Sequence, residues 1–332
     1  MAKYQAVYVL CPGGHKTGGT ELLHQLVYNL NLLGVNSHIV YYGKDNGIHS
    51  AFKKYVSDYT YDISVIQDNE ENLLVVPEIK IDFLNKFTNI TKAVWWLSVD
   101  NYKKNASFSD RVKLRGFGSA VYGLIHGEIK DQKEAISKAD IHFCQSYYSI
   151  DFIKESFGID SDKIYYLSDY INDSYIENYK GVDKNNRKDL VLYNPKKGYK
   201  FTKELIKESG DLSWKPIENM TNEEVISLLS QSKCYIDFGN HPGKDRFPRE
   251  AAICGCIVIT GKRGAAAFKE DVCIPDEYKF DEKTVKKSEI LDCIRDAEKN
   301  YNSRVDDFEE YRKIILNEKQ LFLDNLKEYF VD

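Results

Sequence analysis

The chain of 332 residues carries 46 Lys or Arg against 51 Asp or Glu, a formal net charge of −5. This balance excludes a strongly basic protein that coats nucleic acid, although it leaves room for local basic patches. At about 100–200 residues per domain the length predicts two domains. A hydrophobic fraction of 42% is enough for a packed core in each.

The cysteines and the absence of a targeting pattern predict a cytoplasmic protein. The seven cysteines are odd in number, and Cys144, Cys234 and Cys256 lie in apolar runs, where a reduced thiol packs as a small hydrophobe. No secretory signal is recognisable near the start, and no apolar run approaches the roughly 18 residues that span a bilayer. A peripheral contact with the inner face of the membrane stays open.

In the first half, short apolar runs alternate with longer amphipathic stretches. The runs predicted to be strands are Ala6–Cys11, Ser37–Tyr41, Ile63–Gln67, Leu73–Pro77, Ala93–Leu97 and Ile141–Cys144. Helices are predicted over Thr20–Leu33, whose leucines recur at helical spacing, and over Tyr147–Phe157. Continuous apolar strands alternating with helices are typical of a parallel sheet covered on both faces.

A polar segment, Asn172–Lys188, is the predicted linker, and the same rhythm restarts after it. The elements expected there are strands Leu190–Tyr193, Cys234–Phe238 and Ile257–Thr260, and helices Phe201–Ser209, Asn222–Ser232 and Pro248–Cys254. The predicted fold class is α/β, with two Rossmann-like domains that face each other across a cleft. We expect an N-terminal domain over 1–180, a second domain over 181–308, and a C-terminal helix over 309–332.

A glycine-rich loop, Cys11–Glu21, joins the first strand to the first helix. In an open α/β sheet such a loop lies at the carboxyl ends of the strands, and its glycines let the backbone approach a phosphate. Gly19 stands where a P-loop needs Lys, and the glycines do not match G-x-G-x-x-G, so an NTPase or a dehydrogenase is disfavoured. The alternative is a turn that only connects two elements.

Three loops of the second half carry cations directly after predicted strands. The cations are Lys196, Lys197 and Lys200, then Lys244, Arg246 and Arg249, then Lys262 and Arg263. The loops of a parallel sheet emerge at one edge, so converging cations beside glycines predict a site for a small polyanion such as a diphosphate. Glu250 suits the paired hydroxyls of a ribose instead. The alternative is a set of ordinary lysine-rich loops. Without an aromatic platform nearby, no nucleic-acid partner is expected.

Several of these segments resemble GT-B glycosyltransferases of the glycogen-synthase-like, largely retaining group. Pro248–Ala252, Gly255 and Ile257–Thr260 are similar to the nucleotide-sugar-binding signature of that group. Gly18–Glu21 is similar to its first loop and helix, and Lys197–Gly198 to its Lys-Gly pair. The resemblance covers most of the chain and extends to bacterial capsule and lipopolysaccharide glycosyltransferases. It implies a C-terminal helix that packs back on the first domain.

The resemblance also implies a donor site. The donor-binding residues that it implies are Gly18, Gly19, Thr20, Asn194, Lys197, Ile217, Lys244, Arg246, Arg249 and Glu250. In this reading Glu250 holds the ribose, the cations hold the diphosphate, and the main chain at Ile217 contacts the nucleobase. No Asp-x-Asp pair lies at a strand end, so no metal and no other cofactor are expected beside the nucleotide sugar.

Three residues are candidates for a catalytic role. Asp100 follows a predicted strand and can orient or deprotonate an acceptor hydroxyl, or simply cap a loop. His126 and His241 are candidates for acid–base or sugar-contacting roles, the alternative being ordinary hydrogen-bonded histidines. Pro242 stands where the group has the first of two glutamates, which leaves the stereochemistry open, with retention favoured.

The sequence therefore predicts a metal-independent hexosyltransferase. It would move a sugar from a nucleoside-diphosphate sugar to a hydroxyl of a glycan or lipid-linked glycan, in surface polysaccharide biosynthesis. Two alternatives remain: a nucleotide-sugar epimerase of the same fold, and a non-catalytic nucleotide-sugar-binding partner subunit.

Overall fold

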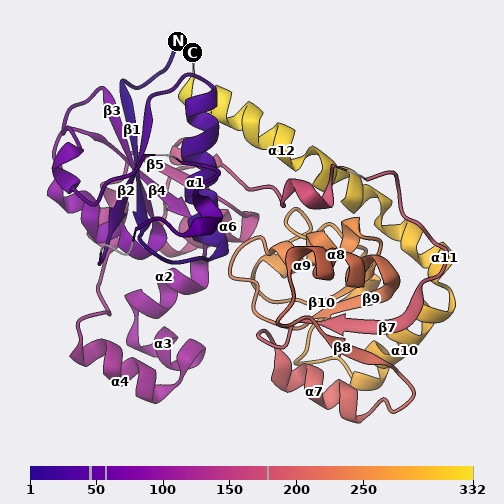
Figure 1. Ribbon diagram of the computed structural model, residues 1–332. Helices are drawn as coiled ribbons and strands as arrows, with labels where there is room; N and C mark the ends of the chain where they lie inside the picture. The colour runs from indigo at the N-terminus through magenta and orange to yellow at the C-terminus, as the bar shows by residue number, and fades with distance from the viewer. Residues whose placement is uncertain (45–46, 57, 178, 332) are drawn as a thin grey trace. The chain divides into compact units, whose positions relative to one another are not determined.

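The computed structural model describes residues 1–44, 47–56, 58–177 and 179–331. The chain divides into two compact units, one made of Met1–Asp169 with Gln320–Asp332 and the other of Tyr170–Lys319. Each unit holds one sheet (Figure 1), and all the paired strands run parallel. The predicted fold class of two Rossmann-like α/β domains is confirmed.

The first unit is built on a sheet with the strand order β2-β1-β3-β4-β5-β6. Its strands are β1 (Ala6–Pro12), β2 (Ser37–Tyr42), β3 (Asn72–Pro77), β4 (Thr91–Trp96), β5 (Ile141–Cys144) and β6 (Ile164–Tyr166). Along β4 the residues from Ala93 to Trp96 are fully buried, as expected for an inner strand with helices on both faces.

The α-helices of this unit are α1 (Gly18–Leu32), α2 (Val99–Ala106), α3 (Phe108–Arg115), α4 (Phe117–Ile125), α5 (Lys133–Ser137) and α6 (Tyr147–Phe157). The expected strand Ile63–Gln67 is wrong. The side chain of Asp62 accepts a hydrogen bond from the amide of Ser64 at 2.9 Å, which starts a 3-10 helix over Ile63–Val65. Side-chain capping of this kind competes with strand pairing.

The second unit is built on a sheet with the order β11-β10-β9-β7-β8. Its strands are β7 (Lys188–Tyr193), β8 (Trp214–Pro216), β9 (Ser232–Asp237), β10 (Ile257–Gly261) and β11 (Lys279–Phe280). Its helices are α7 (Tyr199–Lys207), α8 (Asn222–Gln231), α9 (Arg246–Ile253), α10 (Lys287–Lys299) and α11 (Tyr301–Arg304), followed by the start of α12 (Glu309–Phe330).

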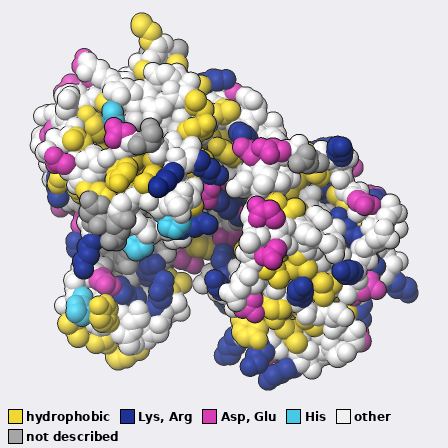
Figure 2. Space-filling view, viewed as in Figure 1, with side chains coloured by type: hydrophobic (Ala, Val, Ile, Leu, Met, Phe, Trp, Pro, Cys, Tyr) yellow, Lys and Arg dark blue, Asp and Glu magenta, His cyan; other side chains and the backbone are white. Residues whose placement is uncertain are grey.

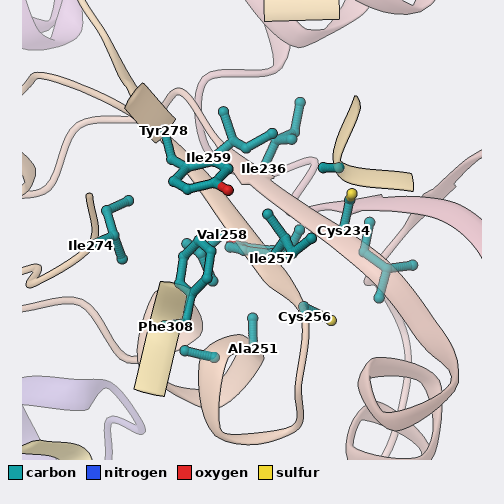
Figure 3. Close-up of a cluster of buried hydrophobic side chains, with 14 of the residues drawn as sticks. Cys234, Ile236, Ala251, Cys256, Ile257, Val258, Ile259, Ile274, Tyr278 and Phe308 are labelled. Carbon is teal, nitrogen blue, oxygen red and sulfur yellow. The ribbon is translucent and has the colours of Figure 1, made fainter. Parts of the chain in front are cut away.

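The core of the second unit lies around β10. Figure 3 shows Ile257 and Val258 of this strand beside Cys234 of β9 and Ala251 of α9, all within one buried apolar cluster. Cys256 belongs to the same cluster, and all seven cysteines of the chain are free thiols. The three cysteines that the sequence places in apolar runs, Cys144, Cys234 and Cys256, are buried.

The boundaries of the two units differ from the predicted ones in a way that the packing explains. Residues 170–180 group with the second unit because Ile171 and Tyr175 lie in its core. The C-terminal helix α12 begins in the second unit, where Ile315 is buried, and ends in the first, where Asn325 donates to the carbonyl oxygen of Tyr166 at 3.0 Å. Among the described residues, none of the helices is long and apolar enough to span a membrane.

Candidate functional site

Two glycines bring the loops after β7 and β9 into close contact. Gly198 has a φ of +61°, and a Cβ there would lie 2.4 Å from the carbonyl carbon of Phe238. A Cβ at Gly239 would lie 2.7 Å from the Cβ of Lys197. Because any larger side chain would force the loops apart, the two glycines fix Lys197 at the carboxyl edge of the sheet.

A chain of polar side chains runs along this edge from β9 to Lys197. Asp237, the last residue of β9, accepts a hydrogen bond from the hydroxyl of Tyr235 at 3.1 Å. The ring of His241 lies between two carboxylates, with Nε2 3.6 Å from Asp237 Oδ1 and Nδ1 3.1 Å from Asp245 Oδ2. The same Asp245 oxygen lies 2.6 Å from Lys197 Nζ. These contacts tie the end of β9 to the loop after β7.

The electrostatics of this chain favour charged partners. Burial alone would lower the pKa of His241, but the carboxylates of Asp237 and Asp245 outweigh it and raise that pKa. Burial would raise the pKa of Asp245, but His241 and Lys197 hold it below its usual value. The His241 side chain is 0% exposed. Its predicted catalytic role therefore stays a prediction, and its place between two acids favours a role in positioning Asp245.

Helix α9 begins at Arg246 and follows Asp245, its N-cap residue. The first turn of a helix has main-chain N–H groups without a partner inside the helix and the positive end of the dipole. Glu250 is half-buried on this helix. After burial, the charge of Glu250 is the largest cause that raises the pKa of the Tyr175 hydroxyl, so the two side chains lie close together. The charge of Arg246 acts on the same hydroxyl in the opposite sense. Arg246, Glu250 and Tyr175 therefore form one group.

Two of the predicted donor-binding cations point into the protein instead. Lys244 Nζ lies 2.8 Å from Glu318 Oε1, and Arg249 Nη1 lies 2.8 Å from Glu318 Oε2. The Lys244 side chain is 4% exposed and that of Arg249 0%. We expected every cation of these loops to lie on the open edge. Lys244 and Arg249 do not, because both pair with the buried carboxylate of Glu318 on α12.

The third predicted loop, after β10, lies against the second. Arg263 forms an ion pair with Glu282 and donates to Asn240 Oδ1 at 3.3 Å. Lys262 is exposed. The structure therefore brings the loops after β9 and β10 together, as the sequence predicted. The charge of Arg263 is partly neutralised by Glu282.

Asn194 and Ile217 follow β7 and β8, and each forms a hydrogen bond with the main chain nearby. The side chain of Asn194 accepts from the amide of Lys196 at 3.0 Å, which turns the chain toward Lys197. Ile217 is buried, and its amide donates to the carbonyl oxygen of Tyr193 at 2.8 Å. A nucleobase contact through Ile217 would thus fall to its carbonyl group.

In the first unit, the glycine-rich loop leads into α1, with Thr17 as N-cap residue. Thr20 closes a capping box: its amide donates to Thr17 Oγ1 at 3.2 Å, and its hydroxyl accepts from the Thr17 amide at 2.9 Å. Both groups of Thr20 are therefore engaged inside the loop. A Cβ at Gly18 would meet nothing within 4 Å among the described residues, so a ligand could approach this backbone.

The other two catalytic candidates, Asp100 and His126, lie on different helical segments of this unit. Asp100 lies in the first turn of α2, and the hydroxyl of Tyr148 approaches its Oδ1 at 3.5 Å. Burial and the charge of Asp100 raise the pKa of Tyr148. His126 follows α4 and is exposed, with its ring 4.0 Å from the ring of Tyr122. The roles of Asp100 and His126 stay predictions.

Asp237, His241 and Asp245 also have the spacing of metal ligands. Over the described ranges of the chain, their ligand atoms form a group that lies within 4.8 Å of one another. The two ring nitrogens of His241 point to different carboxylates, and the ammonium of Lys197 already contacts Asp245. This arrangement fits an internal ion cluster better than a cation site.

Sequence reasoning missed the acids that organise this edge. Asp237 and Asp245 stand four residues before and after His241, and Tyr175 lies in the expected linker. The i±4 spacing around a histidine was a local signal that could have pointed to the two aspartates. Glu318 gave no such signal, because it lies 69 residues from Arg249.

Two parallel α/β units with glycine-rich and basic loops at the carboxyl ends of their strands make up the fold of the GT-B glycosyltransferases. Neither a family model nor a curated protein sequence matches the chain. Similar solved structures include a glycosyltransferase from Rickettsia africae, which is 15% identical with a TM-score of 0.61 and 98% of each chain covered. Sucrose-phosphate synthase from Thermosynechococcus elongatus is 13% identical with a TM-score of 0.55, covering 96% of this chain and 98% of that one.

An alpha-glucosyltransferase bound to UDP-glucose and to DNA is also similar, at 13% identity and a TM-score of 0.56, covering 96% of this chain and 98% of that one. At such identities the likeness establishes the fold. It also corrects one expectation: the exclusion of a nucleic-acid partner is wrong, because enzymes of this fold bind DNA. A net charge of −5 is a whole-chain quantity, and a local basic surface is enough for such binding.

Proposed function

We propose that the protein transfers a sugar from a nucleoside-diphosphate sugar to an acceptor hydroxyl. The observation that carries this proposal is the edge of the second unit. There Gly198 and Gly239 hold Lys197 against the loop that leads into α9, where Arg246 and Glu250 lie one turn apart. The shared fold with sugar transferases supports the same reading.

In this proposal the diphosphate lies at the start of α9. The main-chain N–H groups of Arg246 and Phe247 and the side chains of Arg246 and Lys197 supply positive charge. Glu250 accepts hydrogen bonds from the two ribose hydroxyls. The carbonyl group of Ile217 contacts the nucleobase. In the first unit, the open backbone at Gly18, together with Gly19, where a Cβ would lie 3.6 Å from Leu97 Cδ1, is proposed as a second anion-binding segment.

The proposed chemistry needs no metal. As the bond between the sugar and the diphosphate breaks, negative charge grows on the leaving diphosphate, and the fixed cations and helix dipole stabilise it. Asp100 is proposed to orient the acceptor hydroxyl. We further propose a hexose donor and retention of the anomeric configuration, on the resemblance to the largely retaining group. Activity that is unchanged after treatment with EDTA would support the metal-independent mechanism.

The proposed acceptor is a surface glycan or a lipid-linked glycan. Because alpha-glucosyltransferases of similar structure are bound to DNA, duplex DNA belongs in the same acceptor screen. The screen would use radiolabelled UDP- and GDP-sugars, and transfer to any acceptor hydroxyl would support the proposal. Epimerised donor without transfer, or binding without turnover, would contradict it.

The decisive variant is Glu250→Gln, tested by calorimetric titration with UDP-glucose and the other donors of the screen. Loss of one hydrogen-bonded carboxylate predicts an affinity about 10- to 100-fold lower. Glu223→Gln is the matched control, because Glu223 is an exposed acid in the first turn of α8. Equal donor affinity for wild type and Glu250→Gln would remove the proposed ribose contact, provided that both variants melt at the wild-type temperature.

A further inference from the structure

Helix α4 exposes large apolar side chains. Residues 117–125, Phe-Gly-Ser-Ala-Val-Tyr-Gly-Leu-Ile, contain no charged residue. Phe117 is 68% exposed, Tyr122 53%, Leu124 62% and Ile125 74%. Figure 1 places α3 and α4 beyond α2, away from the sheet of the first unit, and Figure 2 shows hydrophobic side chains gathered over that end.

The exposed side chains form one face of α4. The exposed Phe117, Leu124 and Ile125 and the half-buried Val121 are spaced i, i+7, i+8 and i+4, so they share one side of the helix. We call this set, together with Tyr122, the α4 face. Soluble helices turn such a stripe toward the core, whereas here it points to solvent.

The other side of α4 explains why the helix keeps this orientation. Ala120 and Gly123 are buried, and a Cβ at Gly123 would lie 2.5 Å from the guanidinium of Arg111 on α3. Arg111 is itself buried and donates to Ser119 Oγ at 3.3 Å and to Glu128. Ala120 and Gly123 thus let α4 pack closely against Arg111, which is held by its own hydrogen bonds. This packing orients the α4 face toward solvent.

Cations outnumber acids in the segment around the α4 face, where Arg111, Lys113 and Lys130 are each paired with an acid. Residues 103–130 contain six Lys or Arg and two acids, in a chain whose net charge is −5. Lys113 and Arg115, at the end of α3, are exposed, and Lys104 lies close enough to Arg115 and Arg111 that their charges help to lower its pKa, after burial. Figure 2 shows Lys and Arg side chains beside the hydrophobic ones at this end.

We propose that the α4 face inserts into the headgroup region of an anionic lipid bilayer. An uncharged apolar face, a tyrosine beside it and flanking lysine and arginine side chains are the features of a helix that lies in a membrane interface. Anionic lipid complements the excess of positive charge. Duplex DNA would complement the charge but not the apolar side chains, because protein–DNA interfaces are predominantly polar.

The test is sedimentation of the full chain, without any nucleotide sugar, with vesicles of phosphatidylcholine that contain roughly 30% of the anionic lipid phosphatidylglycerol. Its outcome is therefore independent of the proposed function. We expect binding to these vesicles and little binding to pure phosphatidylcholine. Leu124→Ser with Ile125→Ser should reduce the bound fraction at least tenfold, and Lys113→Gln with Arg115→Gln about fivefold or more.

Two matched controls separate the α4 face from general effects. Leu32→Ser removes a leucine of α1 that is 67% exposed, and Lys203→Gln with Lys207→Gln removes two exposed lysines of α7. Both should bind vesicles as the wild type does. Circular dichroism should show wild-type melting for all variants, and Phe117→Ser serves as a second apolar variant if the double one melts early.

Three results would overturn the proposal. The first is absence of vesicle binding by the wild type. The second is equal loss of binding in the Leu32→Ser control. The third is an α4 face that instead mediates a concentration-dependent dimer, or binds duplex DNA through Lys113 and Arg115 with no effect of the Leu124 and Ile125 changes.

Discussion

The guanidinium of Arg249 lies 2.8 Å from the carboxylate of Glu318, and both side chains are buried. Lys244 contacts the other oxygen of the same carboxylate at 2.8 Å. One acid of α12 thus neutralises two cations of the loop and helix that follow β9. The loop before α9 therefore depends on the C-terminal helix for its charge balance.

Replacing the shared acid should strongly destabilise the second unit. Glu318→Ala leaves Arg249 and Lys244 buried without their anion, and breaking a buried pair costs about 3–5 kcal/mol of the free energy of unfolding. Urea unfolding followed by circular dichroism measures this. Glu309→Gln is the control, because Glu309 pairs with Lys313 on the exposed side of α12 and such pairs contribute about 0–1 kcal/mol. If the two changes lower the free energy of unfolding equally, the buried ion pairs of Glu318 do not stabilise the fold more than an exposed pair does.

A methyl group at Gly198 should separate the loops after β7 and β9. Gly198→Ala places its Cβ 2.4 Å from the main chain of Phe238 and requires a positive φ from alanine. We expect a loss of about 1–3 kcal/mol in the free energy of unfolding. We also expect weaker donor binding, because Lys197 moves away from Asp245. In Gly210→Ala, the control, a Cβ meets nothing within 4 Å among the described residues. Unchanged donor affinity in Gly198→Ala would separate Lys197 from the donor site.

His241 should make the stability depend on pH. Burial and Lys197 act to lower its folded-state pKa, but Asp237 and Asp245 outweigh them and raise that pKa above the ordinary value of 6.5. The charged ring therefore stabilises the fold fully below about pH 6.5, and this contribution is lost as the pH rises through the raised pKa. Urea unfolding between about pH 5.5 and 9, which starts about one unit below the ordinary histidine pKa and extends well above it, should show a steeper decline for the wild type than for His241→Gln. Parallel pH profiles would contradict the charged state of His241, and His38→Gln, an exposed site, is the control.

Glu78 should also make the stability fall as the pH rises, because its carboxyl group is buried. Burial raises its pKa to about 7, although the amide of Leu97 donates to its carboxylate at 3.1 Å. Because the folded state holds the proton more tightly than the unfolded chain, stability falls as the pH rises from about 4.5 to 7. Glu78→Gln should therefore unfold at a higher urea concentration than wild type at pH 8 and at nearly the same concentration at pH 5. Glu70→Gln, at an exposed site, should match wild type at both.

Local signals explain which elements could be predicted. Helix α6 spans Tyr147–Phe157, as the sequence indicated, because a capping box at Ser146 starts it and Gly158 in the left-handed region ends it. Both signals lie within a few residues of the helix ends. The short strands β8 and β11 escaped prediction, since their pairing partners are distant in sequence and their own runs are only three and two residues long.

The candidate site was predicted in outline for the same reason. Loops that follow apolar strands reach one edge of a parallel sheet whatever their details, so Lys197 and Arg246 could be placed from the sequence. The inward direction of Arg249 could not, because it depends on Glu318, which is 69 residues away. Arg246 and Arg249, three residues apart on α9, therefore differ in exposure, because Glu318 pairs with Arg249 inside the protein.

The course of α12 has a consequence for the order in which the protein folds during synthesis. Phe330, near the end of this helix, stacks on Phe143 of the first unit with ring centroids 5.5 Å apart, and its carbonyl oxygen accepts from the amide of Lys3 at 2.9 Å. At translation rates of about 5–20 residues per second, the residues that complete the first unit leave the ribosome on the order of ten seconds after residue 169. The unit that is translated first is therefore completed last. A nascent chain stalled before α12 should expose Phe143 to chaperones.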